Sequence, residues 1–292
     1  MAVVLNLEPL GYSEEAENII GPSYVAGNPT LLHVLRPDVI ITRLAYNITG
    51  EIMDEAANLR AIVSATTGLD HIDLDAARDR GIEVLSLQGE AEFLRTIPAT
   101  AEHTWALLLA LLRRIPWAFE DVKAGNWNRD AWRGSNLTGK RITVLGGEGR
   151  VGSQVRGYAT AFGMKVISAD KRFALGDTDI LTIHVPLNEN TRDMISYDEL
   201  PRTRILINTS RAEIVNQHAM FVGLLTGRLE GAATDVIPNE REGRVATSLL
   251  EYARHHDNLL ITPHIGGATH EAMEATEIFC ARKLVAWLKQ NA

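Results

Sequence analysis

Short runs of β-branched and aliphatic residues alternate with amphipathic segments along the first third of the chain. The apolar runs predict buried strands and the amphipathic segments predict helices. The predicted strands are residues 3–7, 39–42, 60–64 and 82–85, and the predicted helices are residues 14–20, 49–58 and 73–80. Strands and helices that alternate with short connections are typical of a parallel sheet covered by helices.

The rest of the chain continues this alternation after a long apolar helix, expected from residue 98 to about 115, with Pro116 after it. Such a helix is either deeply buried or part of a subunit interface. The later predicted strands are residues 142–145, 165–169, 180–185, 204–208, 231–236 and 259–262, and the later helices end at 162 and span 216–226 and 271–290. The pattern predicts an α/β protein with two Rossmann-like domains, each built on a doubly wound parallel sheet.

Composition narrows the possible functions. The 292 residues suffice for one large or two medium domains, and a net charge of −8 argues against a broad nucleic-acid-binding surface. The only cysteine, Cys280, cannot form an internal disulfide, which suits a reducing compartment. No apolar run approaches the roughly twenty residues of a membrane span, and the N-terminus does not resemble a signal peptide. We expect a cytoplasmic protein that binds no membrane, nucleic acid or metal.

Residues 141–170 have the pattern of a dinucleotide-binding unit. Gly147 is expected to permit a tight turn, Gly149 to let a pyrophosphate approach the backbone, and Gly152 to let the helix pack on the strand. The helix N-terminus offers N–H groups and a positive dipole end to phosphates. Asp170 lies near the distance of roughly twenty residues at which a carboxylate binds the ribose of NAD. The alternative is a glycine-rich surface turn.

The connection after Asp170 is short. Asp170 ends one predicted strand and Asp179 precedes the next. A right-handed parallel crossover normally takes a dozen or more residues, usually with a helix. The sheet is therefore expected to lack its usual covering helix at this edge, unless the sequence omits residues. An adenine ring would normally rest there, so the departure bears on cofactor affinity.

Three ionisable residues, Arg211, Glu240 and His264, follow the later predicted strands. In an open α/β sheet the carboxyl ends of the strands face the ligand crevice, so all three are expected beside it. An imidazole can donate the proton that reduction of a ketone requires, a carboxylate can fix its tautomer, and a guanidinium can hold a carboxylate through two hydrogen bonds. Together they describe a 2-oxo acid reductase, although each alone is compatible with a structural or surface residue.

The chain resembles the D-isomer-specific 2-hydroxyacid dehydrogenase family, which includes phosphoglycerate, glycerate and D-lactate dehydrogenases. The resemblance covers nearly everything from Arg43 to Gly267. The matching stretches are residues 68–77, 101–104, 147–152, 184–187, 207–211 and 262–269.

This resemblance implies roles for individual residues. Arg211 would anchor the substrate, His264 would be the acid/base and Glu240 its partner. The implied substrate contacts are Thr66, Thr67 and Gly68, with Arg43 as a second carboxylate or phosphate contact, although a structural ion pair explains Arg43 equally well. The implied cofactor contacts are Gly147, Gly149, Arg150, Val151, Gly152, Asp170, His184, Pro186, Thr209, Asp235 and Gly267, with Thr104 also a candidate.

The cofactor is expected to be NAD. A carboxylate at Asp170 would repel the 2′-phosphate of NADP, although Lys171 and Arg172 could meet one. Formate dehydrogenases of this superfamily carry Gln where Glu240 stands, so formate is not the expected substrate. Ala212 stands where the family most often has Gly, and we expect little effect.

The sequence thus predicts an NAD-dependent enzyme that interconverts a D-2-hydroxy acid and its 2-oxo acid. A flavodoxin-like substrate domain would comprise residues 1–95 and 271–292, and the dinucleotide-binding domain residues 96–270. The long helix and the segment with Trp117, Trp127 and Trp132 suggest a homodimer, with local core packing as the alternative for the tryptophans. Two alternatives stay open: an NAD-sensing, corepressor-like binding protein on the same fold, and a degenerate dehydrogenase with impaired cofactor binding.

Overall fold

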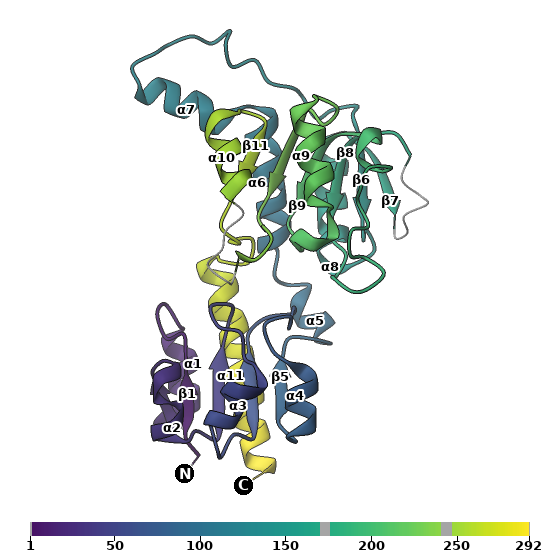
Figure 1. Ribbon diagram of the computed structural model, residues 1–292. Helices are drawn as coiled ribbons and strands as arrows, with labels where there is room; N and C mark the ends of the chain where they lie inside the picture. The colour runs from purple at the N-terminus through teal and green to yellow at the C-terminus, as the bar shows by residue number, and fades with distance from the viewer. Residues whose placement is uncertain (1, 170–175, 241–246, 292) are drawn as a thin grey trace. The chain divides into compact units, whose positions relative to one another are not determined.

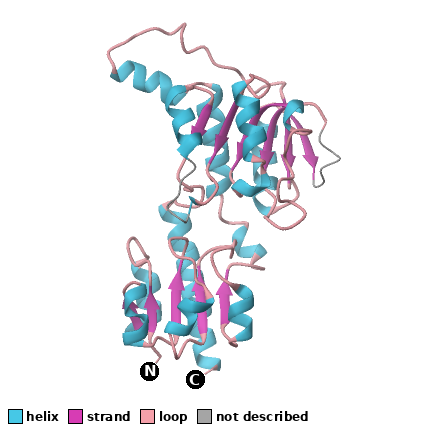
Figure 2. Cartoon of the chain, in the orientation of Figure 1, coloured by secondary structure: helices cyan, strands magenta, loops and turns pink. Residues whose placement is uncertain are grey.

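The chain folds into two compact units (Figures 1 and 2). A computed structural model describes residues 2–169, 176–240 and 247–291. Unit 1 comprises Met1–Thr96 and Thr269–Ala292, and unit 2 comprises Ile97–Ala268. The last helix of the chain therefore belongs to the same unit as the N-terminal residues.

Unit 1 is built on a sheet of five parallel strands in the order β2-β1-β3-β4-β5. This order is that of flavodoxin-like folds, in which the chain reverses its direction of growth between the first and third strands. The central strands are aliphatic on both faces, as expected where helices cover both sides of a parallel sheet. The strands are β1 (Val4–Asn6), β2 (Tyr24–Ala26), β3 (Val39–Thr42), β4 (Ala61–Ser64) and β5 (Glu83–Ser86).

Helices cover both faces of this sheet. Val39 and Ile41 pack toward the face covered by α1 and α11, whereas Ile40 packs with residues of α2, α3 and α4 on the other face. Thr49, the predicted N-cap, does cap α3 through a bond from the Ile52 N–H. The helices are α1 (Glu14–Ile20), α2 (Leu32–Leu35), α3 (Gly50–Glu55), α4 (Leu74–Asp79), α5 (Ala91–Leu94) and α11 (His270–Gln290), with 3₁₀ turns at Gly21–Ser23 and Pro29–Leu31.

Unit 2 is built on a sheet of six parallel strands in the order β11-β10-β9-β8-β6-β7. The reversal lies between β6 and β8, as in dinucleotide-binding folds, whose usual order is 3-2-1-4-5-6. The strands are β6 (Arg141–Leu145), β7 (Lys165–Ala169), β8 (Thr178–Ile183), β9 (Thr203–Asn208), β10 (Gly231–Thr234) and β11 (Leu259–Ile261).

Two apolar layers sandwich this second sheet. One contains Leu145, Leu181 and Leu206 with side chains of α9 and α10, and the other contains Val144 and Ile207 with side chains of α6 and α8. The helices are α6 (Ala99–Leu112), α7 (Ile115–Lys123), α8 (Arg150–Ala161), α9 (Gln217–Leu225) and α10 (Thr247–His255), with 3₁₀ turns at Leu200–Arg202 and Ala212–Ile214. The predicted fold class, two Rossmann-like domains with parallel sheets, is confirmed.

Two local expectations were wrong. The long apolar helix ends at Leu112, and Pro116 lies in the first turn of a separate helix, α7, where its missing N–H costs nothing. Trp117 therefore lies in a helix and packs against the core of unit 2, whereas Trp127 is exposed. Asp179 lies within β8 and does not precede it.

The edge of the second sheet is formed by β7. β7 ends at Ala169 and β8 begins at Thr178, and residues 170–175 between them lie outside the described part of the chain. Among the described residues no strand lies outside β7. Ile167, on the face away from α8, is more than one-third exposed. The described residues thus provide no helix that covers Ile167.

Candidate active site

The glycine-rich loop joins the end of β6 to the N-terminus of α8. Gly146 makes the turn, with φ of +78°, and a Cβ there would lie 2.6 Å from the His184 carbonyl oxygen. The turn was predicted at Gly147, which does lie in it, but the positive φ belongs to Gly146. A Cβ on Gly147 would lie 2.4 Å from the Ser168 hydroxyl of β7 and 3.0 Å from the Val144 carbonyl oxygen, so a side chain there would force its neighbours to shift.

The remaining glycines of the loop set the distance between α8 and β6. A Cβ on Gly152 would lie 2.2 Å from the Gly146 carbonyl oxygen, so only glycine permits this packing. A Cβ on Gly149 would come within 3.1 Å of that same oxygen and would otherwise meet open space. Gly149 is the N-cap of α8 and supplies no side-chain cap to the helix. The loop therefore presents glycine backbone and a helix N-terminus, the features that fit a pyrophosphate.

Arg150 and Val151 form the first turn of α8. Burial lowers the pKa of the Arg150 guanidinium, and Val151 packs against the core between α6, α8 and the sheet. Asp170, the predicted ribose ligand, lies outside the described residues. Of the predicted contacts around the phosphates and the adenosine, the structure therefore places the glycines, Arg150 and Val151 but not Asp170.

His184 and Pro186 follow β8 directly. The His184 N–H donates to the Leu145 carbonyl at 2.8 Å, which joins the residue to the strand before the glycine loop. Its Nε2 lies 2.9 Å from the Thr182 hydroxyl. Burial lowers the pKa of His184 to about 3, so the imidazole is neutral near pH 7. Pro186 is exposed, and its carbonyl accepts a bond of 2.7 Å from the Thr191 hydroxyl.

The predicted catalytic residues follow three adjacent strands. Arg211 follows β9, Glu240 follows β10 and His264 follows β11. Because β9, β10 and β11 are parallel neighbours, their carboxyl ends lie at one edge of the sheet. The topology alone therefore brings these three loops to the same edge of unit 2.

His264 and Glu240 are in direct contact. His264 Nδ1 lies 2.5 Å from Glu240 Oε1, and both side chains are about one-quarter exposed. A proton on Nδ1 that is donated to the carboxylate leaves Nε2 for exchange with a ligand. The backbone of His264 has φ of +54°, and its N–H donates to the Asp235 carbonyl at 2.8 Å. This left-handed conformation, unusual for a non-glycine residue, is thus held by the end of β10.

Asp235 holds the rest of the loop that carries His264. Its buried carboxylate accepts bonds from the Ile265 N–H at 2.9 Å, the Gly266 N–H at 2.7 Å and the Thr262 hydroxyl at 2.6 Å. His103 Nε2, from α6, lies 3.1 Å from the same carboxylate. Burial alone would raise the pKa of Asp235, but these donors hold it below the usual range. Asp235 is therefore an anion whose charge organises the loop.

Arg211 continues an ordered turn after β9. The Asn208 side chain accepts from the Ser210 N–H at 3.0 Å and donates to the Arg211 carbonyl at 2.9 Å. Arg211 Nη1 donates to the Ser210 carbonyl at 2.9 Å. The Ser210 hydroxyl bonds the Val185 carbonyl, which ties this turn to the one after β8.

Thr104 and Thr209, both expected near the nicotinamide, are brought together by the structure. Their hydroxyls lie 2.8 Å apart, and Thr104 also donates to the Thr100 carbonyl at 2.7 Å within α6. Both side chains are buried. Gly267, also expected near the nicotinamide, is exposed, and a Cβ there would meet nothing within 4 Å. The pair of hydroxyls therefore joins α6 to the residue after β9.

The predicted substrate contacts of unit 1 follow β4. The Thr66 hydroxyl lies 2.8 Å from the Ser64 hydroxyl and donates to the Gly68 carbonyl at 2.9 Å, which closes the turn. Thr67 is exposed. Ser64 is bonded in turn by His71 Nε2 at 3.2 Å.

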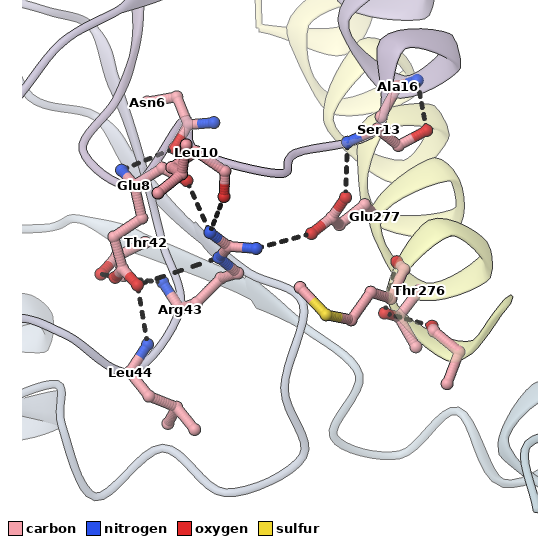
Figure 3. A network of polar contacts seen from close by, with 12 residues as sticks. Asn6, Glu8, Leu10, Ser13, Ala16, Thr42, Arg43, Leu44, Thr276 and Glu277 are labelled. Carbon is pink, nitrogen blue, oxygen red and sulfur yellow. Dashed lines mark hydrogen bonds and ion pairs between the residues drawn. The ribbon is translucent and has the colours of Figure 1, made fainter. Parts of the chain in front are cut away.

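Arg43 follows β3 and lies in a network of polar contacts (Figure 3). Nη1 contacts Glu277 Oε1 at 3.3 Å, and Nη2 donates to the carbonyls of Glu8 and Leu10 at 2.9 and 2.8 Å. The structural ion pair that the sequence left open for Arg43 is therefore present. Its role as a substrate contact stays a prediction.

Sequence reasoning missed His103, Glu8 and Glu277. His103 lies in the stretch 101–104 that carries the family resemblance, and Glu8 lies two residues after β1, so position alone could have marked both. Glu277 lies inside α11 and carries no such signal. Within the described part of the chain, no cluster of three or more His, Cys, Asp or Glu side chains could hold a metal ion, and no helix is both long and apolar enough to cross a membrane.

Comparison with known proteins shows which protein family the chain resembles. Residues 105–266 match the model of the D-isomer specific 2-hydroxyacid dehydrogenase, NAD binding domain. The chain is 32% identical to a hydroxypyruvate reductase of Thermotoga maritima over 268 residues, which is 85% of this chain and 83% of that protein. It is 33% identical to the D-3-phosphoglycerate dehydrogenase of Bacillus subtilis over 91% of this chain but only 51% of that protein. The chain thus spans about half the length of that relative.

Solved structures agree with the fold. The chain superposes on the D-lactate dehydrogenase of Aquifex aeolicus, solved in complex with NAD and lactic acid, with a TM-score of 0.82 and 25% identity. The match covers 99% of this chain and 96% of that one.

Proposed function

We propose that this chain, which belongs to the D-isomer specific 2-hydroxyacid dehydrogenase family, uses NAD to interconvert a D-2-hydroxy acid and its 2-oxo acid. The family membership carries the general reaction class and the cofactor. The observation that carries the catalytic assignment is the contact between His264 Nδ1 and Glu240 Oε1 at 2.5 Å, at the carboxyl edge of the sheet. We find no observation that favours a corepressor-like scaffold or a degenerate enzyme.

His264 is the proposed proton donor to the substrate oxygen in the reduction and the proton acceptor in the oxidation. Glu240 holds Nδ1, fixes the tautomer and leaves Nε2 to exchange the proton. NAD, when bound, supplies the hydride acceptor or donor for C2 of the substrate. Asp235 keeps the His264 loop in its left-handed conformation through the bonds to residues 264–266.

Arg211 is the proposed anchor of the substrate carboxylate, because a guanidinium can hold a carboxylate through two parallel hydrogen bonds. Support comes from its place after β9, next to the strand that leads to Glu240. The turn around Asn208 and Ser210 fixes its backbone. In unit 1, Thr66, Thr67 and Gly68 follow β4 and are the proposed backbone contacts to the substrate.

The glycine loop and α8 are the proposed pyrophosphate site, with Gly147, Gly149, Arg150, Val151 and Gly152 as its residues. The support is steric, because a Cβ at Gly149 would occupy otherwise open space beside the helix N-terminus. We further propose His184, Pro186, Thr104, Thr209, Asp235 and Gly267 as cofactor contacts. The preference for NAD over NADP rests on Asp170 and stays a prediction.

The assembly is proposed to be a homodimer. Support comes from α7 and the segment after it, whose exposed apolar side chains include Phe119, Val122 and Trp127. Light scattering that gives the mass of a single chain would contradict the dimer. A cytoplasmic location also stays a prediction.

The test of the proposed function is NADH binding by fluorescence, followed by a panel of 2-oxo acids: glyoxylate, hydroxypyruvate, pyruvate and 3-phosphohydroxypyruvate. Oxidation of NADH by any of them, with loss of turnover in His264→Ala, is the expected result. NADH binding without turnover of any oxo acid would contradict the proposed reaction and leave the fold assignment intact.

A further inference from the structure

The carboxyl ends of β1 and β3 form the point in unit 1 where the strand order reverses. In open parallel sheets, ligands bind outside the carboxyl ends of the strands at such a point. Two charged residues stand there: Glu8 follows β1, and Arg43 follows β3. Both are largely buried, with 10% and 19% of their side chains exposed.

The segment after β3 forms a group of donors that we call the anion nest: the backbone N–H groups of Arg43, Leu44 and Ala45 and the hydroxyl of Thr42. All four donors point at the Glu8 carboxylate (Figure 3 shows the bonds to Thr42, Arg43 and Leu44). Oε1 accepts from Thr42 at 2.9 Å and Arg43 at 2.7 Å, and Oε2 accepts from Leu44 at 3.3 Å and Ala45 at 3.2 Å. Successive N–H groups that converge in this way bind carboxylates and phosphates.

The guanidinium of Arg43 is also engaged. Nη2 donates to two carbonyls, those of Glu8 and Leu10, and Nη1 contacts Glu277. Glu277, with 2% of its side chain exposed, is held by the Ser13 N–H at 2.7 Å. A ligand phosphate that binds the Arg43 guanidinium would therefore have to displace these three partners.

The charges at this edge oppose a second anion. The carboxylates of Glu8 and Glu277 flank one guanidinium, so the cluster carries no net positive charge when all three groups are ionised. A phosphate would bring further negative charge beside Glu8, and like charges placed side by side at a binding site exclude the wrong ligand.

We propose that Glu8 fills the anion nest in place of a ligand and thereby makes the enzyme select 2-oxo acids without a phosphate group. This inference rests on the proposed function and names its substrate class: small oxo acids whose only anionic group is the carboxylate. Arg43 then joins the segment after β1 to α11 and does not bind substrate. Removal of the Glu8 side chain opens the nest to a phosphate.

The test compares hydroxypyruvate with 3-phosphohydroxypyruvate, which differ only in the phosphate, at saturating NADH. We expect kcat/KM of the wild type to favour hydroxypyruvate by at least about tenfold. In Glu8→Gly this preference should fall by about tenfold or more, and in Glu8→Gln, which keeps an acceptor oxygen but no charge, by an intermediate factor. Glu14→Gln removes a charge from the exposed first turn of α1 and should leave the ratio unchanged.

A second readout does not depend on turnover. Inorganic phosphate should raise the melting temperature of Glu8→Gly more than that of the wild type or Glu14→Gln, because the site at α8 is common to all three. This difference in melting temperature would support the role of Glu8 in the anion nest even if no oxo acid were reduced. The absence of reduction would contradict only the proposed function.

Two outcomes would overturn the inference. One is a wild type that prefers 3-phosphohydroxypyruvate. The other is a folded Glu8→Gly variant whose kcat/KM ratio and phosphate response equal those of the wild type, which would make Glu8 a structural residue. If Glu8→Gly does not fold, the isosteric Glu8→Gln decides by the kcat/KM ratio, because its side chain removes the charge but still fills the nest.

Discussion

His103 of α6 and Asp235, the residue after β10, are joined at 3.1 Å, although 132 positions separate them in the sequence. The carboxylate that receives this contact also receives the N–H groups of Ile265 and Gly266. The loop that carries His264 is therefore fixed from two sides, by the end of its neighbouring strand and by a helix on the face of the sheet. His103 is a positioning residue in this arrangement, because it acts on the His264 loop through Asp235 and through the Thr262 hydroxyl, which lies 3.0 Å from its Nε2.

Replacement of His103 tests this relationship. His103→Leu removes a donor to a buried carboxylate, which should lower the free energy of unfolding by about 2 kcal/mol. The loosened loop should also lower kcat by roughly tenfold, with a smaller effect on KM for the oxo acid. His103→Gln, whose amide can reach Asp235, should restore most of both quantities. Urea unfolding and steady-state kinetics measure them, and equal losses of kcat in the two variants would contradict the positioning role.

The catalytic pair is tested by His264→Ala and Glu240→Gln. Loss of the proton donor should lower kcat by roughly 10²–10⁴. Glu240→Gln keeps the size of the side chain and an acceptor for Nδ1 but removes the negative charge, so a smaller loss, roughly tenfold to a hundredfold, is expected.

NADH binding, measured by fluorescence, should be retained in both variants, because the glycine loop lies on other strands of the sheet. Turnover by His264→Ala at the rate of the wild type would remove His264 from the mechanism.

Much of the fold follows from the sequence because burial on both faces leaves a clear signal. Val39–Thr42 is fully buried, Thr203–Asn208 is buried except for Arg204, and both are central strands. Tyr24–Ala26 was not predicted as a strand, because it is a short edge strand with partly exposed side chains. The boundary between α6 and α7 was missed for another reason. Arg114 adopts a left-handed conformation there, with φ of +55°, and the residue pattern does not predict it.

The candidate site follows from the sequence only in part. The predicted strand ends place the loops of Arg211, Glu240 and His264 at one edge of the sheet, because parallel strands share one carboxyl edge. The pairing of Thr104 with Thr209 depends on how α6 crosses the sheet, which periodicity does not encode. Glu8 occupies the anion nest through contacts between residues 34 to 37 positions apart in the sequence. The pattern of apolar and polar residues could not predict these contacts.

The cofactor site is tested by two glycines of the same helix region. Gly149→Ala places a Cβ 3.1 Å from the Gly146 carbonyl oxygen, a contact that a small shift can relieve, but fills the space beside the helix N-terminus. We expect folding to be retained and the Kd for NADH to rise about tenfold or more.

Gly157→Ala is the matched control, because a Cβ at that position of α8 meets nothing within 4 Å. It should raise the free energy of unfolding by about 0.5–1 kcal/mol and leave NADH binding unchanged. Fluorescence titration and urea unfolding measure both quantities, and unchanged NADH binding in Gly149→Ala would place the pyrophosphate elsewhere.

His184 makes stability depend on pH. Burial lowers its pKa to about 3 in the folded state, whereas an unfolded chain has a histidine pKa of about 6.5. As the pH falls below about 6.5, His184 of the unfolded state binds a proton, whereas that of the folded state stays neutral. The stabilisation from neutral His184 is thus complete above the unfolded pKa and is lost as the pH falls toward the folded one, by at most about 1.4 kcal/mol per pH unit.

We therefore expect His184→Asn to have a flatter decline in the free energy of unfolding between pH 6.5 and 5 than the wild type, measured by urea unfolding at each pH. His33→Asn, at an exposed position of α2, is the control and should decline as the wild type does. The lower bound of pH 5 keeps most carboxyl groups ionised, so that the difference between the variants reports the imidazole. Parallel curves for the wild type and His184→Asn would mean that His184 takes up its proton in the folded state as readily as in the unfolded chain.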